Sequence, residues 1–229
     1  MKLCVPTLCR YDLLDELLKS AERGSLTPDG YIIIDNGNGY PRKRLNALLG
    51  ERSFVAELIA PGRNLGVAAS WNRFLDLTKG ETLIVSNDDV ALGQHTFRDL
   101  VVASGRSPFV GHGWFLFAQT PECTERVGYY DENFWPGYYE DSDYQVRLHR
   151  AGIERREPQL DGYVHHQSAT TGQLGEDWIR ERRALNRQYF LQKWNGLMLG
   201  QDPLHLFKEP FNGSPPPGWR LRSPLSKGT

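Results

Sequence analysis

The sequence has few of the features that mark several large classes of protein. Its 229 residues include only three cysteines (Cys4, Cys9 and Cys123), an odd number without the spacing of metal ligands. We therefore expect these cysteines to be reduced thiols, and we do not expect a disulfide scaffold. No apolar run approaches the roughly 18 residues that a membrane span requires. The first apolar stretch ends at Arg10, too early for a signal peptide. We expect a cytoplasmic protein without an integral membrane segment.

The sequence also lacks an excess of charge of either sign. The chain has 27 basic and 28 acidic side chains, a net charge of −1, which argues against a protein that holds nucleic acid mainly by bulk positive charge. Hydrophobic residues at 39% and charged residues at 24% are ordinary for a globular domain, and argue against a disordered chain or a coiled coil. Basic residues outnumber acidic ones only after residue 176. That segment would suit a polyanionic acceptor or a membrane surface, and a solvated helix face with a tail explains it equally well.

Strand-like and helix-like patterns alternate through the first 90 residues. Short apolar runs typical of buried parallel strands occur at 3–5, 31–34, 54–60 and 82–85. Helical spacing follows three of these runs, at 14–21, at 42–49 and after Asn64, which can cap a helix. This order predicts an α/β fold whose mostly parallel sheet has helices on both faces.

The second half of the sequence is less regular. Residues 109–118 predict one or two strands around two glycines, and residues 128–139, rich in Gly, Tyr and Trp, predict an ordered loop. Ser142 and Gln145 have the spacing of a capping box that opens a helix. A short strand is expected to end at His165.

A final helix and a tail are expected at the end of the chain. Four apolar residues of this helix are expected on one side of it: Trp178, Leu185, Tyr189 and Trp194. We place one domain over residues 1–196 and a proline-rich tail over 197–229.

Polar side chains follow two of the predicted strands at the point where each strand ends. Asp35 and Asn36 come after one strand, and Asn87, Asp88 and Asp89 come after another. Open parallel sheets bind ligands at the carboxyl ends of their strands, so a nucleotide pocket is expected there. Neighbouring acids at a strand end suit a divalent cation that bridges to phosphates, although Asn and Asp are also ordinary turn residues.

Three acids crowd the start of the helix near residue 140. Asp143 can pair with Arg147 one turn later, and any of the acids can interact favourably with the positive end of the helix dipole. Glu140 and Asp141 directly follow an aromatic run, residues 134–139. A carboxylate held against aromatic walls is partly desolvated, which raises its pKa toward general-base use.

Two histidines and one glycine-rich segment are weaker candidates. His165 and His166 are consecutive on a strand, so their side chains point to opposite faces and at most one faces the pocket. Residues 62–66 could present backbone amides to a diphosphate, but they match neither the dinucleotide fingerprint nor the Walker loop. No residue is placed convincingly as a covalent nucleophile.

Taken in order, these pieces resemble the family 2 glycosyltransferases of the GT-A fold, particularly the rhamnosyltransferase-like branch. The likeness covers roughly residues 3–195. The matching stretches are Val5-Pro6-Thr7, Ile34-Asp35-Asn36-Gly37, Asn64-Leu65-Gly66, Asn87-Asp88-Asp89-Val90, Val127-Gly128, Asp131-Glu132, Tyr139-Glu140-Asp141-Ser142-Asp143 and Tyr189-Phe190.

The resemblance implies which residues bind the donor. Pro6, Thr7 and Asp35 would line the nucleotide pocket, with Asp35 accepting a hydrogen bond from the base. Asn64 and Gly66 would lie near the donor. The implied donor is a nucleoside-diphosphate sugar, with UDP- or dTDP-sugars the usual choice of the family.

The resemblance also implies a metal site and a catalytic base. Asp89 would hold Mn²⁺ or Mg²⁺ against the diphosphate, with Asp88 beside it at the donor site. His165 would be a second ligand, or His166 if the register is shifted by one. The first acid of the family's Asp-x-Asp element is replaced here by an asparagine at position 87, which leaves one main carboxylate ligand.

The implied activity is an inverting transfer of a sugar to an acceptor hydroxyl. Asp141 would act as general base, with Glu140 beside it, and the metal would stabilise the leaving diphosphate. Two alternatives stay open: a non-catalytic module that binds nucleotide sugars, and a sugar-phosphate nucleotidyltransferase. The acceptor is equally open among a glycan, a glycolipid, a protein and a modified nucleic-acid base, because the fold does not fix it.

Overall fold

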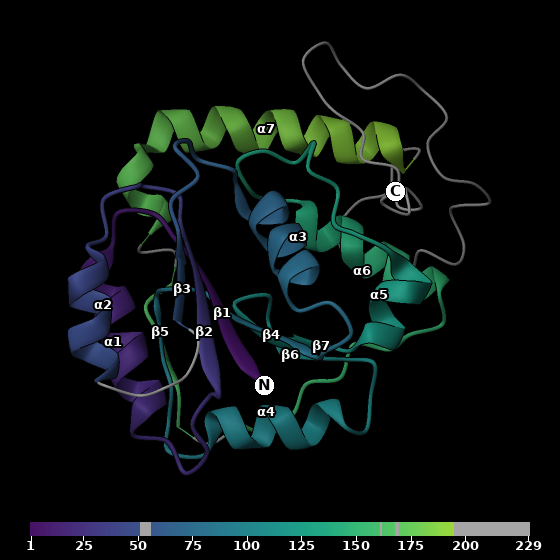
Figure 1. The fold of residues 1–229 in the computed structure, drawn as a ribbon. Helices are drawn as coiled ribbons and strands as arrows, with labels where there is room; N and C mark the ends of the chain where they lie inside the picture. The colour runs from purple at the N-terminus through teal and green to yellow at the C-terminus, as the bar shows by residue number, and fades with distance from the viewer. Residues whose placement is uncertain (51–55, 161, 168–169, 195–229) are drawn as a thin grey trace.

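A six-stranded sheet forms the centre of the protein (Figure 1). The computed structural model describes residues 1–50, 56–160, 162–167 and 170–194. The strands are β1 (Lys2–Thr7), β2 (Gly30–Asp35), β3 (Ala56–Ile59), β4 (Leu83–Ser86), β6 (Phe109–His112) and β7 (Leu116–Gln119), in the order β3-β2-β1-β4-β7-β6. The first four are parallel, and β7 and β6 form an antiparallel hairpin at the β4 edge. The predicted α/β class and the mostly parallel sheet are confirmed.

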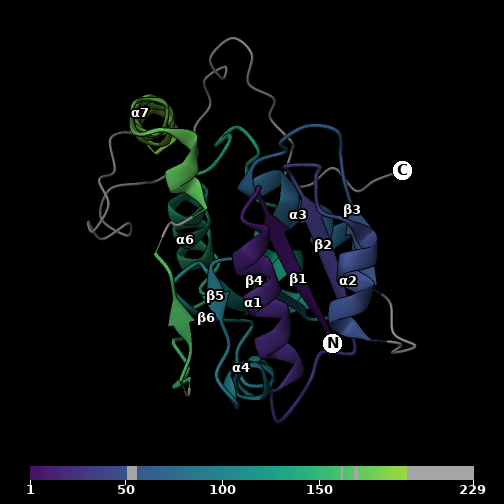
Figure 2. The same ribbon diagram turned by 90° about the vertical axis from the view of Figure 1, so that its left-hand side faces the viewer.

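Helices cover both faces of this sheet, as Figures 1 and 2 show. One face carries α1 (Tyr11–Glu22), α2 (Arg42–Leu49) and α4 (Thr96–Ser104), and the other carries α3 (Val67–Leu77), α5 (Pro121–Val127) and α6 (Glu140–Arg150). Alternation along β1 explains this: Leu3 and Val5 point into the first layer and Cys4 into the second. All six residues of β2 are buried, as a strand covered on both faces requires.

A second, two-stranded sheet stands beside the first. It pairs β5 (Val90–Ala91) with β8 (Val164–His165) in antiparallel register, so that Val90 lies opposite His165. The backbone amide of His166 donates to the carbonyl of Asp89 over 2.8 Å. Two predicted site elements, 75 residues apart in sequence, are thereby joined by main-chain pairing.

The last helix, α7 (Glu176–Lys193), follows the short 3₁₀ helix Thr171–Leu174 and lies across the top of the sheet in Figure 1 and over α6 in Figure 2. Its packing against α6 forms a third apolar cluster, which consists of Phe134, Val146, Tyr189, Phe190 and Trp194. No helix of the described residues is long and apolar enough to cross a membrane. The predicted tail over 197–229 lies outside the described residues, as does the boundary at 196.

Three local predictions are wrong. Gly66, with φ of 82°, is the N-cap of α3, and Asn64 instead accepts a 2.8 Å hydrogen bond from the Gly66 amide. The helix α6 begins at Glu140, so Ser142 is no cap; its amide donates to Asp141 Oδ1 over 2.7 Å. Leu185 is 38% exposed, because the buried side of α7 is centred on Asn186, Tyr189 and Phe190.

Candidate active site

A cavity of about 330 Å³ opens at the carboxyl ends of β1 and β4. The loop 134–139, the start of α6 and the start of α7 close its other sides. Its walls include nine of the eleven residues predicted from the sequence: Pro6, Thr7, Asn64, Gly66, Asp88, Asp89, Glu140, Asp141 and His165. Asp35 and His166 are not among the lining residues. Segments spread over most of the described chain thus meet at one place.

Asp89 and His165 face each other in this cavity. His165 Nε2 lies 3.6 Å from Asp89 Oδ1, and that buried oxygen has no hydrogen-bond partner among the described residues. The ring of His165 is held by stacking on Phe115, with centroids 3.9 Å apart. His166 points the other way, with Nε2 3.3 Å from a carboxylate oxygen of Glu16. The alternation predicted for the two histidines is confirmed.

This pair suits a divalent cation that takes its remaining ligands from elsewhere. A buried carboxylate oxygen without a donor and a nearby imidazole nitrogen are both ordinary metal ligands. No group of three or more His, Cys, Asp or Glu side chains gathers as a metal site in the described part of the chain. The two residues could therefore supply two ligands to such a cation, which would need its remaining ligands from outside this pair.

Asp88 has a different role from its neighbour. Its carboxylate accepts hydrogen bonds from Thr7 Oγ1 over 2.6 Å and from Thr170 Oγ1 over 2.7 Å, and a weaker one from the Leu8 amide. Burial raises the pKa of Asp88 to about 6. The side chain of Asp88 thus links the end of β1 to the segment before α7. These hydrogen bonds support the part of the cavity wall that Asp89 also lines.

Glu140 and Asp141 begin α6 at the cavity. Asp141 is partly exposed, and its Oδ1 accepts hydrogen bonds from the amide and hydroxyl of Ser142. Glu140 is buried, and its Oε2 has no partner in the described structure. Burial raises the pKa of Asp141, and burial together with the charge of Asp141 raises the pKa of Glu140 well above its usual range. The two adjacent acids therefore differ: the pKa of Glu140 is raised further, so Glu140 favours its protonated form more strongly than Asp141 does.

A strained turn lies directly before these two acids in the chain and positions them. Tyr138 and Tyr139 both have positive φ, at 71° and 73°, a region that non-glycine residues rarely adopt. Asn186 on α7 is buried, and its side-chain amide donates to the carbonyls of Trp135, Gly137 and Tyr138 at 3.4, 2.7 and 3.2 Å. One side chain thus holds the main chain that precedes the acids.

The carbonyl of Pro136, in the middle of the same loop, is also fixed. The Val67 amide donates to the Pro136 carbonyl over 2.8 Å, which joins the loop to the start of α3. A Cβ at Gly66 would stand 2.9 Å from that carbonyl oxygen and from the ring of Trp135. Glycine is needed at this position for both its positive φ and the close approach.

Asp35 lies behind the cavity wall. Its carboxylate accepts hydrogen bonds from the hydroxyl of Tyr11 and from the amides of Gly37 and Tyr40, so it organises the turn after β2. Its neighbour Asn36 lines the cavity instead, with Oδ1 bonded to the Leu65 amide. The sequence signal was the same for both residues, and only the turn geometry separates them.

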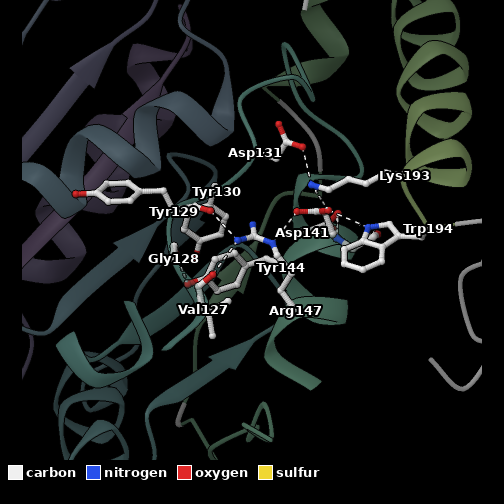
Figure 3. Close-up of polar contacts among 12 residues, drawn as sticks. Val127, Gly128, Tyr129, Tyr130, Asp131, Asp141, Tyr144, Arg147, Lys193 and Trp194 are labelled. Atoms are coloured by element: carbon white, nitrogen blue, oxygen red, sulfur yellow. Dashed lines mark hydrogen bonds and ion pairs between the residues drawn. The ribbon is translucent and has the colours of Figure 1, made fainter. Parts of the chain in front are cut away.

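A buried ionic network joins α6 to α7 behind the two acids (Figure 3). Asp143 contacts Arg147 Nε at 2.9 Å, Lys193 Nζ at 2.6 Å and Trp194 Nε1 at 2.9 Å. Lys193 also reaches Asp131 over 2.6 Å. Figure 3 shows Arg147 turned toward the main chain of 127–129, where it donates to two carbonyls. The pairing of Asp143 with Arg147 predicted from their spacing is confirmed.

Comparison with protein families gives one match. Residues 3–149 fit the model of the family described as glycosyl transferase family 2. No curated protein matches the sequence significantly. The matched range contains every lining residue up to Asp141 and ends before α7.

Several solved structures share this fold. A mannosyltransferase from Pyrobaculum calidifontis, in complex with GDP-Man and Mn²⁺, has a TM-score of 0.62 at 17% identity, over 81% of this chain and 61% of its own. Glucosyl-3-phosphoglycerate synthase from Mycobacterium tuberculosis, in complex with Mn²⁺, UDP and glucosyl-3-phosphoglycerate, has a TM-score of 0.62 at 14% identity, over 87% of this chain and 81% of its own. TarS of S. aureus has a TM-score of 0.57 at 13% identity, over 83% and 70%. At these identities the likeness shows the fold alone, which is the GT-A fold.

Proposed function

The chain belongs to glycosyl transferase family 2, and we propose that it moves a sugar from a nucleoside-diphosphate sugar to an acceptor hydroxyl with inversion, using Asp141 as general base. One observation carries the proposal. A single cavity holds a metal-type pair, Asp89 with His165, and a partly exposed carboxylate of raised pKa. Binding of GDP-Man, UDP and Mn²⁺ by structures of the same fold supports it.

The donor would occupy the side of the cavity formed by the ends of β1 and β4. Pro6 and Thr7 line it there, and Asn64 and Gly66 line it at the start of α3. A divalent cation at Asp89 and His165 would supply Lewis-acid stabilisation of the diphosphate leaving group. UDP and dTDP remain the nucleotides that we favour, and Asp35 would contribute to base recognition through the turn that it organises.

Removal of the proton from the acceptor hydroxyl requires only residues of this chain. Asp141 accepts the proton of the acceptor hydroxyl as its oxygen attacks the anomeric carbon from the face opposite the leaving diphosphate. A single displacement inverts the configuration, so no covalent sugar–protein intermediate forms. Burial raises the pKa of Glu140, and in its protonated form this side chain would donate a hydrogen bond into the same cavity.

Thermal unfolding with nucleotides tests the donor site. We expect one of UDP, dTDP, GDP and ADP to raise the melting temperature in the presence of Mn²⁺ and much less without it. A ligand that binds only the folded state adds about 2.7 kcal/mol at a hundredfold excess over its Kd. Absence of a shift with all four nucleotides would contradict the proposed donor site. Release of pyrophosphate in place of nucleoside diphosphate during turnover would favour the nucleotidyltransferase alternative.

The two histidines provide matched variants for the same measurement. His165→Phe keeps an aromatic ring to stack on Phe115 but removes the metal-binding nitrogen. We expect it to weaken the Mn²⁺-dependent shift at least about tenfold in metal concentration, since loss of even an outer-shell partner costs that much. His166→Phe should leave the shift unchanged, because His166 faces Glu16. Equal effects of the two substitutions would remove His165 from the metal site.

Asn186→Ala tests how the acids are positioned. Loss of the three hydrogen bonds to the loop should let Tyr138 and Tyr139 relax and displace Asp141. Because a displacement of about 1 Å can cost about 10²-fold in rate, we expect kcat to fall by up to that factor while nucleotide affinity stays the same. Gln188→Ala, an exposed change on the same helix, is the control. A lower melting temperature with unchanged kcat would mean that Asn186 only stabilises the fold.

A further inference from the structure

Two tryptophans stand together at the mouth of the cavity. Trp178 of α7 lines the cavity, and Trp135 of the loop 134–139 is 39% exposed. Their rings are nearly perpendicular, with centroids 6.0 Å apart. The indole nitrogen of Trp135 donates to the Asn64 carbonyl, which fixes that ring at the start of α3. Such paired faces can contact the apolar face of a sugar ring.

A guanidinium group lies against both rings. The Cζ of Arg182 is 5.6 Å from the centroid of Trp135 and 5.8 Å from that of Trp178. Its Nε is buried without a hydrogen-bond partner, and Arg182 forms no ion pair with any carboxylate of the described chain. By contrast, Arg180 on the same helix is paired with Asp177. The guanidinium of Arg182 is thus positioned by the two rings and still has N–H donors that could bind a ligand.

A second arginine lies close by. The Cζ of Arg183 is 5.1 Å from the ring centroid of Tyr138, which also lines the cavity. Like Arg182, it forms no ion pair within the described residues. Two cations therefore face the loop 134–139 from α7, at the rim of a cavity whose interior carries acids.

The rim and the interior of the cavity differ in charge, so each suits a different chemical group of a ligand. Asp89 and Asp141 line the interior, where a hydroxyl can meet a base but an anionic group would be repelled unless a metal is present. The rim offers arginine donors, which match phosphate and carboxylate oxygens. A ligand that fits both parts has a hydroxyl on one side and an anionic group on the other.

We propose that Trp135, Trp178 and Arg182 form the acceptor subsite, and that the acceptor is a carbohydrate or polyol that carries a phosphate or carboxylate group near the accepting hydroxyl. This inference rests on the proposed function, because it takes Asp141 as the point to which the hydroxyl is delivered. The subsite is built mainly on α7, which lies beyond the residues that match the family model. It therefore accounts for a preference of this chain that the shared fold does not determine.

Binding of small probes tests the subsite without a need for turnover. Glucose 1-phosphate and glucuronic acid represent the two anionic groups, and methyl glucoside is the neutral control. Saturation-transfer NMR and tryptophan fluorescence would measure binding of each probe with and without UDP and Mn²⁺. We expect both anionic probes to bind at least about tenfold more tightly than the neutral one, as a charge-assisted hydrogen bond predicts.

Variants assign the binding to the proposed residues. Arg182→Gln should remove the preference for anionic probes, and Trp178→Leu should weaken all three probes, while Arg180→Gln should change neither. Nucleotide-dependent melting should stay unchanged in every variant. If nucleotides fail to bind the unaltered protein, the proposed function fails on its own account, whatever the probes do.

Three results would overturn the inference. The first is equal binding of neutral and anionic probes, or no binding of any anionic probe at millimolar concentration. The second is an Arg182→Gln protein that binds the probes like Arg180→Gln. The third is a loss of nucleotide affinity in Arg182→Gln with unchanged probe binding, which would assign this arginine to the donor diphosphate.

Discussion

Asp141→Asn is expected to reduce sugar transfer by about 10²–10⁴-fold, the contribution that a positioned general base makes. The amide keeps the shape of the side chain and its contact with Ser142, but it cannot accept the proton of the acceptor hydroxyl. Nucleotide binding should survive, because the metal-type pair is formed by other residues. Release of nucleoside diphosphate under single-turnover conditions measures the first effect, and nucleotide-dependent melting measures the second.

Glu140→Gln is the matched control for this prediction. Burial raises the pKa of Glu140 and so favours its protonated form, and a neutral glutamine preserves a hydrogen-bond donor at the same place. We therefore expect a much smaller loss of transfer than in Asp141→Asn. Full turnover in Asp141→Asn, or an equal loss in both variants, would remove Asp141 from the role of base. Activity of the unaltered protein should fall as pH decreases through the raised pKa of Asp141, since only the ionised form accepts a proton.

The parts of the site that the sequence predicts are those fixed by local pattern. Apolar runs identified the strands, and parallel strands bring their polar ends to one edge, which placed Asp88 and Asp89 at the cavity. Alternation along a strand predicted that only one of His165 and His166 would face it. The helix α6 was predicted from its acids and its spacing, although the predicted capping box put its N-cap at Ser142, three positions after the observed N-cap Tyr139.

The parts that the sequence does not predict depend on contacts between distant segments. Asn186 holds a loop almost 50 residues earlier, and nothing around it in the sequence marks a buried amide on a mostly polar helix. The role of Arg182 likewise depends on two tryptophans that only tertiary packing brings together. The helices α4 and α5 were missed because they are short, with nine and seven residues, so their apolar side chains span too few turns for the helical period to be recognised.

The buried network behind the site leads to the largest expected effect on stability. The side chain of Asp143 is fully buried and contacts two cations, Arg147 and Lys193. Asp143→Ala would leave these cations with one fewer carboxylate in a dry environment. We expect a loss of about 3–5 kcal/mol in the free energy of unfolding, the usual cost of removing one partner of a buried pair. Urea denaturation at neutral pH measures it.

A surface pair of the same spacing is the control for Asp143. Arg126 and Glu122 are also four residues apart, but both are exposed, so Glu122→Ala should cost at most about 0.5 kcal/mol. A similar loss in both variants would mean that burial adds nothing to the network. Replacement of the whole cluster by apolar residues is a separate case and need not destabilise the fold.

The same carboxylate predicts how stability depends on pH. Burial opposes ionisation of Asp143, but the charges of Lys193 and Arg147 outweigh it and lower its pKa. A group whose pKa is lower in the folded state stabilises the protein fully above its unfolded pKa and loses that contribution as pH falls through the folded value. The difference in unfolding free energy between the unaltered protein and Asp143→Asn should therefore be largest at neutral pH and shrink on acidification below the ordinary pKa of aspartate. A difference that stays constant down to the acid transition would show that the network acts by packing and hydrogen bonding alone. In that case the α6–α7 contact, which also supports the loop held by Asn186, would not depend on charge.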